Sequence, residues 1–142
     1  MRTVNDLLQA ALALDPDAVM ELSMAAGADT YVKQQREQMY DGINSEGLAI
    51  EPEYKPFTVQ MKESKGQPST RVTLKDTGSF YEEMYADPRG DKMYIDSKDS
   101  KSNELQEKYG DEIFGIQGEY REPFTLSVQE VMITNVREKL GV

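Results

Sequence analysis

The triplet Asp76-Thr77-Gly78 is the part of the chain whose residue types most directly suggest chemistry. In an aspartic protease such a triplet supplies one carboxyl of a proton-sharing pair, and a repeat or a dimer mate supplies the other. Here Lys75 precedes the aspartate, its ammonium group would be costly to bury beside a dry carboxyl pair, and no second triplet occurs. The sequence therefore favours a turn in which Asp76 and Thr77 cap nearby backbone and Gly78 takes a positive φ, with a dimeric aspartic protease as the alternative.

Two further groups of residues match metal or phosphate sites only in part. Asp96–Glu107 is rich in acidic and small polar residues, but Lys98 and Lys101 stand where an EF-hand calcium loop needs a ligand and a glycine. The glycines at 110, 115 and 118 lack the Gly-Lys-Ser/Thr step of a phosphate-binding loop. We therefore predict no catalytic residue, no metal ligand and no cofactor, and we expect Asp99 or Ser100 to cap a short helix.

The composition narrows the class of function. The chain has 142 residues and neither Cys nor His, which excludes thiolate and imidazole chemistry. A formal net charge of −10 is repelled by phosphate backbones and argues against direct nucleic-acid binding as the main role. No apolar run reaches the roughly 20 residues that span a bilayer, and we interpret the stretch 7–14 as a helix rather than a signal peptide. We expect one globular domain over residues 1–142, of cytoplasmic origin and without a membrane role.

Tyrosine is the most frequent aromatic residue, and methionine is equally frequent. There are eight of each, against four Phe and no Trp. Tyrosine is enriched at protein interfaces because it is large and has a polar tip, and methionine makes adaptable surfaces. These side chains indicate either an interface or the half-buried rim of a sheet.

The first 47 residues are predicted to be helical. Thr3 or Asn5 can cap a first helix, and Asp15-Pro16-Asp17 ends it and starts a second one. Asp29-Thr30 is expected to cap a third helix. That helix carries one stripe at four-residue spacing, formed by Tyr31, Gln35, Met39 and Ile43.

Residues 48–98 are predicted to contain strands. Phe57–Lys62 alternates apolar and polar side chains, which is typical of a strand, and a second extended run covers Arg71–Leu74. Residues 80–85 fit either a strand or a turn of helix.

A hairpin is expected across residues 79–96. Asp87–Asp91 has the composition of a turn, and Lys92–Asp96 reads as a short strand that follows it. The polar segment 87–103 is a candidate for a loop or hairpin tip that becomes ordered against a partner.

Residues 99–142 are expected to add two helices. A short one covers Ser102–Tyr109 and ends at Gly110, and a long one opens at Glu122-Pro123. The predicted fold class is therefore α+β, with N-terminal helices and a long C-terminal helix packed on a small antiparallel sheet. The apolar stripe of the long helix consists of Phe124, Val128, Val131, Met132, Val136 and Leu140.

The order of these motifs resembles that of the phage tail-completion or virion-morphogenesis proteins, which are minor tail or neck proteins of Mu-type and related phages. One departure lies at Leu105–Lys108, where the family usually shows a tyrosine-alanine pair and a histidine or glutamine near the glycine. The helical lead 34–43 into Gly47 also fits the family. The matching residues are Leu74, Asp76, Thr77, Gly78, Phe80, Tyr94–Ser97, Tyr109-Gly110, Ile113–Ile116, Arg121, Pro123 and Phe124.

This resemblance implies a structural virion protein, made in the bacterial host cytoplasm, at the head–tail junction. Such a protein would self-associate into a homo-oligomeric ring and connect the portal or adaptor to the tail, without catalytic residues. A small acidic protein-binding module or inhibitor is the alternative that the net charge allows. The residues expected to form the structural motif are Asp76, Thr77, Gly78, Gly110, Arg121, Pro123 and Phe124.

Overall fold

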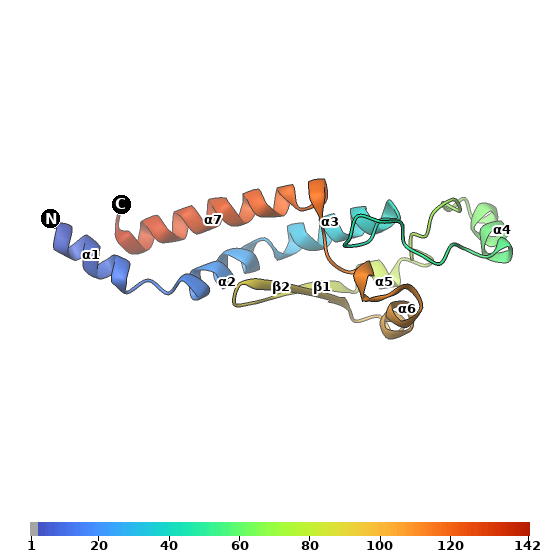
Figure 1. The fold of residues 1–142 in the computed structure, drawn as a ribbon, viewed down its shortest axis with the longest axis horizontal. Coiled ribbons are helices and arrows are strands. Elements are labelled where there is room, and N and C mark those ends of the chain that lie inside the picture. Colours follow the sequence, from blue (N-terminus) through green and yellow to red (C-terminus); the bar gives the residue numbers. More distant parts are fainter. Residues whose placement is uncertain (1–2) are drawn as a thin grey trace.

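The chain folds into an elongated body of three layers (Figure 1). A computed structural model describes residues 3–142. The long helix α7 (Glu122–Leu140) runs along α1 (Val4–Leu12), α2 (Pro16–Ala26) and α3 (Ala28–Tyr40), and a β-hairpin covers α2 and α3 on the opposite side. The α+β class with N-terminal helices, a long C-terminal helix and a small antiparallel sheet is confirmed. The remaining elements are α4 (Pro56–Ser64), α5 (Ser79–Glu82), α6 (Ser102–Tyr109) and the 3₁₀ turns Asp111–Ile113 and Gly118–Tyr120.

The first two helices begin where their capping residues predict. Thr3 and Asp6 form a capping box, in which each side chain accepts a hydrogen bond from the other residue's backbone N–H. Asp15 accepts from two N–H groups at the start of α2, and Pro16 occupies the first helical position. The predicted cap of the third helix at Asp29-Thr30 is wrong. Because Gly27 alone joins α2 to α3, the third helix already begins at Ala28.

The predicted hairpin is present and antiparallel. Strand β1 (Met84–Arg89) pairs with β2 (Lys92–Ser97), so that Met84 lies opposite Ser97 and Arg89 opposite Lys92. The turn is tighter than its composition predicts, because Asp87 and Pro88 lie within β1. Gly90 makes the turn with φ +62°, and its N–H donates to the Glu21 carboxylate on α2. Residues 80–85, left open between strand and helix, divide between α5 and the start of β1.

The predicted strand at Phe57–Lys62 is wrong, because these residues lie in α4. Pro56 stands at the first turn of a helix, where its missing N–H costs nothing, and Phe57 and Met61 are then one helical turn apart. An isolated strand would also leave its backbone unpaired. The run Arg71–Leu74 forms no strand either. Burial does not alternate along this run, because Val72, Thr73 and Leu74 are all buried, and Leu74 breaks the extended path with φ +58°.

The core lies where α3 meets the hairpin and the segments beside it. Met39 of α3 and Ile113 are fully buried and join one cluster with Phe80 and Met84. Nearer the start of α3, the Tyr31 ring meets the Phe124 ring edge-on at 4.9 Å. Tyr31, Gln35 and Met39 of the predicted α3 stripe are buried, but Ile43 lies beyond the end of the helix at Tyr40 and forms a β-bridge with Ala49. Within residues 3–142, no helix combines the length and the apolar character needed to cross a bilayer.

Candidate functional site

The Asp-Thr-Gly triplet forms the turn that starts α5. Gly78 has φ +95°, as the sequence predicts, and is the N-terminal cap residue of the helix. The Thr77 hydroxyl accepts the N–H of Ser79 at 3.4 Å and lies 3.1 Å from the Ser79 hydroxyl. This geometry places Phe80 and Tyr81, the next two residues, in the core.

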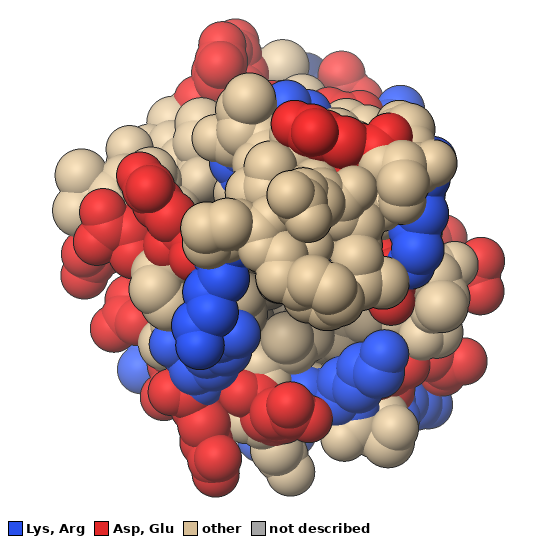
Figure 2. All heavy atoms as spheres, turned by 90° about the vertical axis from the view of Figure 1, so that its right-hand side faces the viewer, with Lys and Arg blue, Asp and Glu red and all other residues tan. Residues whose placement is uncertain are grey.

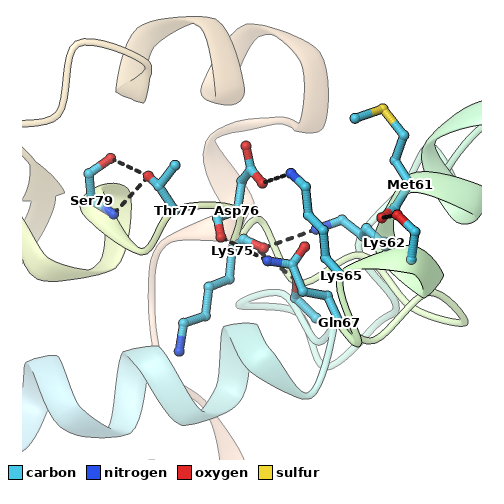
Figure 3. A network of polar contacts seen from close by, with 10 residues as sticks. Met61, Lys62, Lys65, Gln67, Lys75, Asp76, Thr77 and Ser79 are labelled. Atoms are coloured by element: carbon cyan, nitrogen blue, oxygen red, sulfur yellow. Dashed lines mark hydrogen bonds and ion pairs between the residues drawn. The ribbon is translucent and has the colours of Figure 1, made fainter.

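The same triplet is the point at which α4 is attached (Figure 3). The Lys65 ammonium pairs with the Asp76 carboxylate at 3.0 Å, and Gln67 donates to the Asp76 carbonyl at 2.9 Å. Lys62 donates to the Lys75 carbonyl, also at 2.9 Å. The hydrogen bond from Lys65 lowers the pKa of Asp76 below its ordinary value. Asp76 thus acts in this chain as an exposed anionic anchor, which differs from the dry, proton-sharing carboxyl of an aspartic protease.

A pocket of about 280 Å³ opens between α4, the triplet and α6. Its apolar wall includes Phe57 and Met61 of α4 and Leu105 of α6. Seen from this end, the molecule presents an uncharged central surface with basic and acidic groups around it (Figure 2). The charged residues that line the pocket are Lys62, Lys65, Lys75, Lys101 and Asp76.

Lys62 is the buried cation of this pocket. The residue is only 8% exposed, and its ammonium group lies 5.0 Å from the centre of the Tyr54 ring. Among residues 3–142, no carboxylate lies within ion-pair distance of it. A buried ammonium group held by one carbonyl and a ring face keeps much of its positive potential, so the pocket favours anionic partners.

Tyr54 shapes the backbone behind the pocket. Its hydroxyl accepts the N–H of Thr73 at 3.0 Å and the N–H of Leu74 at 3.3 Å. The Tyr81 hydroxyl donates to the Thr73 carbonyl, and burial raises the pKa of the Tyr81 phenol. Two tyrosines therefore hold the bend at Leu74 that leads into the triplet.

The predicted motif residues fall into separate places. Asp76, Thr77 and Gly78 frame the pocket, and Gly110 ends α6 directly after Tyr109, which lines it. Arg121 lies at the start of α7, where its guanidinium donates to the Ile116 carbonyl at 3.1 Å. Pro123 occupies the first turn of α7, and the Phe124 ring packs against Gly27 and Tyr31.

The acidic stretch before α6 forms a turn that leads into the helix. The predicted cap at Asp99 or Ser100 is wrong, because the N-terminal cap residue is Lys101 and no side chain caps the helix. The Asp99 carboxylate accepts the N–H of Lys101 at 2.8 Å, and this hydrogen bond lowers the pKa of Asp99. Asp96 accepts the Ser102 hydroxyl, also at 2.8 Å. No group of three or more acidic residues within 3–142 is arranged to hold a metal ion.

Lys62 and Tyr54 are the site residues that sequence reasoning missed. Both lie in a segment that was interpreted as strand and loop, so their shared place in a pocket had no signal in the one-dimensional pattern. The spacing of Phe57 and Met61 at one helical turn was the available clue.

Comparison of the chain with protein-family models, with curated proteins and with solved structures gave no match.

Proposed function

We propose that this chain is a structural protein of a phage virion, located at the head–tail junction, where it forms a ring by self-association and connects the portal or adaptor to the tail. The observation that carries the proposal is a pair of exposed apolar surfaces at the two ends of an elongated body (Figure 1). One surface is on α1, and the other, with Phe57 72% exposed, is on α4. Exposed apolar patches of this kind mark contact surfaces.

The order of motifs supports the placement at the head–tail junction. The residues that carry the resemblance to tail-completion proteins include Asp76-Thr77-Gly78 and Tyr109-Gly110, and both segments border the pocket at the α4 end. In this proposal, their side chains and backbone shape a contact surface. The motif therefore fits a protein that works through its surfaces.

Assembly measurements test this proposal. We expect the purified chain to associate with increasing concentration in sedimentation velocity, and electron microscopy of the assembled fraction to show closed rings. Addition of a purified portal–adaptor complex should promote assembly. A chain that stays monomeric at all concentrations and does not bind portal–adaptor complexes would contradict the proposal.

A small acidic protein-binding module or inhibitor is the second candidate, and one observation favours it. Residues 3–32 contain five acidic side chains and no Lys or Arg, so this segment offers carboxylates to a basic partner. A pull-down that returns a basic host enzyme, such as a nuclease, and no virion protein would favour this candidate. A dimeric aspartic protease would instead lose proteolytic activity on Asp76→Ala substitution.

A further inference from the structure

We propose that the pocket beside α4 binds helix α1 of a second copy of this chain, so that copies associate head to tail. This inference rests on the proposed self-association and names its contact. The apolar stripe of α1 would enter between α4 and α6, against Phe57, Met61 and Leu105. The stripe consists of Val4, Leu8 and Leu12.

Helix α1 has the form of a donor element. Val4, Leu8 and Leu12 follow each other at four-residue spacing and therefore lie on one face. They are 84%, 53% and 71% exposed, and no residue of α1 is buried. The helix touches α7 along another face, so its apolar stripe is left open to solvent. A short amphipathic helix gains most of its stability from packing, which the second copy would supply.

The pocket has the form of an acceptor. Phe57 and Met61 project from one face of α4 and are 72% and 43% exposed. Together with the pocket floor they offer an apolar groove next to the buried ammonium group of Lys62. A helix that inserts side chains one turn apart matches a groove whose own side chains are one turn apart.

The charges of the two elements are complementary. Four lysines and one aspartate line the pocket, whereas the donor segment carries Asp6 in α1 and Asp15 and Asp17 directly after it, with no Lys or Arg between residues 3 and 32. The lysine-lined pocket stands out in a chain whose net charge is −10. Opposite charges on the donor segment and the pocket favour a contact between unlike surfaces, and they disfavour a symmetric contact that brings two lysine-lined pockets together.

The positions of the two elements require an intermolecular contact. Helix α1 lies at one end of the long axis and α4 at the other, so one copy cannot bring its own α1 to its own pocket (Figure 1). Each copy therefore offers one donor, its helix α1, and one acceptor, its pocket beside α4. A contact between unlike surfaces produces a closed ring if the rotation between copies closes, and an open chain if it does not.

A complementation experiment tests this contact. Leu8→Lys removes the donor and places a cation against the pocket lysines, while Phe57→Glu removes the acceptor and repels the acidic α1 segment. Both side chains are exposed, so the fold should be kept, and circular dichroism checks it. We expect each variant alone to self-associate at least about tenfold more weakly than the wild type in sedimentation velocity. Leu22→Lys, at another exposed apolar position on α2, is the matched control and should behave as wild type.

The mixture of the two blocked variants gives the decisive result. The intact α1 of Phe57→Glu can enter the intact pocket of Leu8→Lys, so we expect a one-to-one dimer that grows no further. Self-association of either variant at wild-type strength, or a mixture that stays monomeric, would overturn the inference, as would a wild type that is monomeric at all concentrations.

The two proposals fail in different ways. Rings that persist in the Leu8→Lys variant would overturn the α1 contact and leave the virion function standing. A one-to-one dimer on mixing, with a wild type that forms no closed ring and binds no portal complex, would support the α1 contact and contradict the virion function.

Discussion

Gln35 and Gly115 are joined by a 2.7 Å hydrogen bond from the backbone N–H of the glycine to the side-chain oxygen of the glutamine. The amide nitrogen of Gln35 donates in turn to the Ile113 carbonyl at 3.1 Å. Gln38 repeats the arrangement, with its nitrogen 2.7 Å from the Gly115 carbonyl and its oxygen accepting the N–H of Gln117 at 2.9 Å. Two buried side chains of α3 therefore satisfy the backbone of segment 113–117, in the way that a neighbouring strand would.

Replacing Gln35 by Leu should destabilise the fold strongly. The substitution keeps the approximate size of the side chain but removes its amide group, and it leaves the buried Ile113 carbonyl and the partly buried Gly115 N–H without partners, which costs about 2 kcal/mol or more. Urea unfolding followed by circular dichroism measures the loss. Gln129→Leu, at an exposed position of α7, is the control and should change the unfolding free energy by less than about 0.5 kcal/mol. Equal effects of the two substitutions would contradict the role given to Gln35.

Removal of the Tyr54 hydroxyl should loosen the bend that leads into the triplet. Tyr54→Phe keeps the ring beside Lys62 but leaves the N–H groups of Thr73 and Leu74 without their acceptor. We expect a loss of about 1–3 kcal/mol in unfolding free energy. Hydrogen exchange should also become faster at these two amides. Tyr94→Phe, which alters a half-exposed ring on the hairpin, should leave both measurements unchanged; a similar loss there would point to a general effect of tyrosine removal.

A side chain at position 110 should destabilise the fold. The backbone of Gly110, at φ +90° and ψ +158°, lies in a region reserved for glycine, and an added Cβ would also require the flexible Glu112 side chain to move. We expect Gly110→Ala to cost about 1–3 kcal/mol in thermal or urea unfolding. Gly66→Ala is the matched control, because Gly66 has φ +68° and open space around it, and it should cost less. A smaller loss at position 110 than at 66 would mean that the exit of α6 can rearrange.

The ion pair between Lys65 and Asp76 should give a small, pH-dependent stabilisation. Because the folded-state pKa of Asp76 is lowered, this contribution is present above the carboxyl's ordinary pKa and is lost as the pH falls through the lowered value. Both side chains are about half exposed, so the contribution of the ion pair to the unfolding free energy should stay below about 1 kcal/mol. Unfolding free energies of wild type and Asp76→Asn should therefore differ at pH 7 and converge in acid. In a Lys65→Met background, Asp76→Asn should have a smaller effect; an undiminished effect there would show that the pairing contributes nothing.

Local signals in the sequence predicted much of the fold. The caps at Thr3 and Asp15, the start of α7 at Glu122-Pro123 and the strand from Lys92 follow from residues close in the chain, and the structure has them. The positive φ of Gly78 was predicted in the same way. Capping and turn formation involve backbone groups within a few residues, so a local pattern is enough to recognise them.

The candidate site was much less predictable. The alternation in Phe57–Lys62 was read as a strand, although the pattern equally places Phe57 and Met61 on one face of a helix. With α4 misassigned, the pocket could not be anticipated, nor could the burial of Lys62. A short apolar run fits both the strand period and the helix period. Whether the segment becomes a strand or a helix depends on what it can pair with or pack against.

The sequence by itself determined the absence of imidazole and thiol chemistry, the acidic charge, the starts of α1, α2 and α7, and the glycine turns at Gly78 and Gly110. The tertiary structure decided that Asp76 is an anchor for α4, that Gln35 and Gln38 replace a missing strand, and that four lysines come together around one pocket. The reason is the distance along the chain: the partners of Gln35 and Gln38 are 77 to 80 residues away. Contacts of that separation arise only when the whole chain has packed, and no local pattern records them.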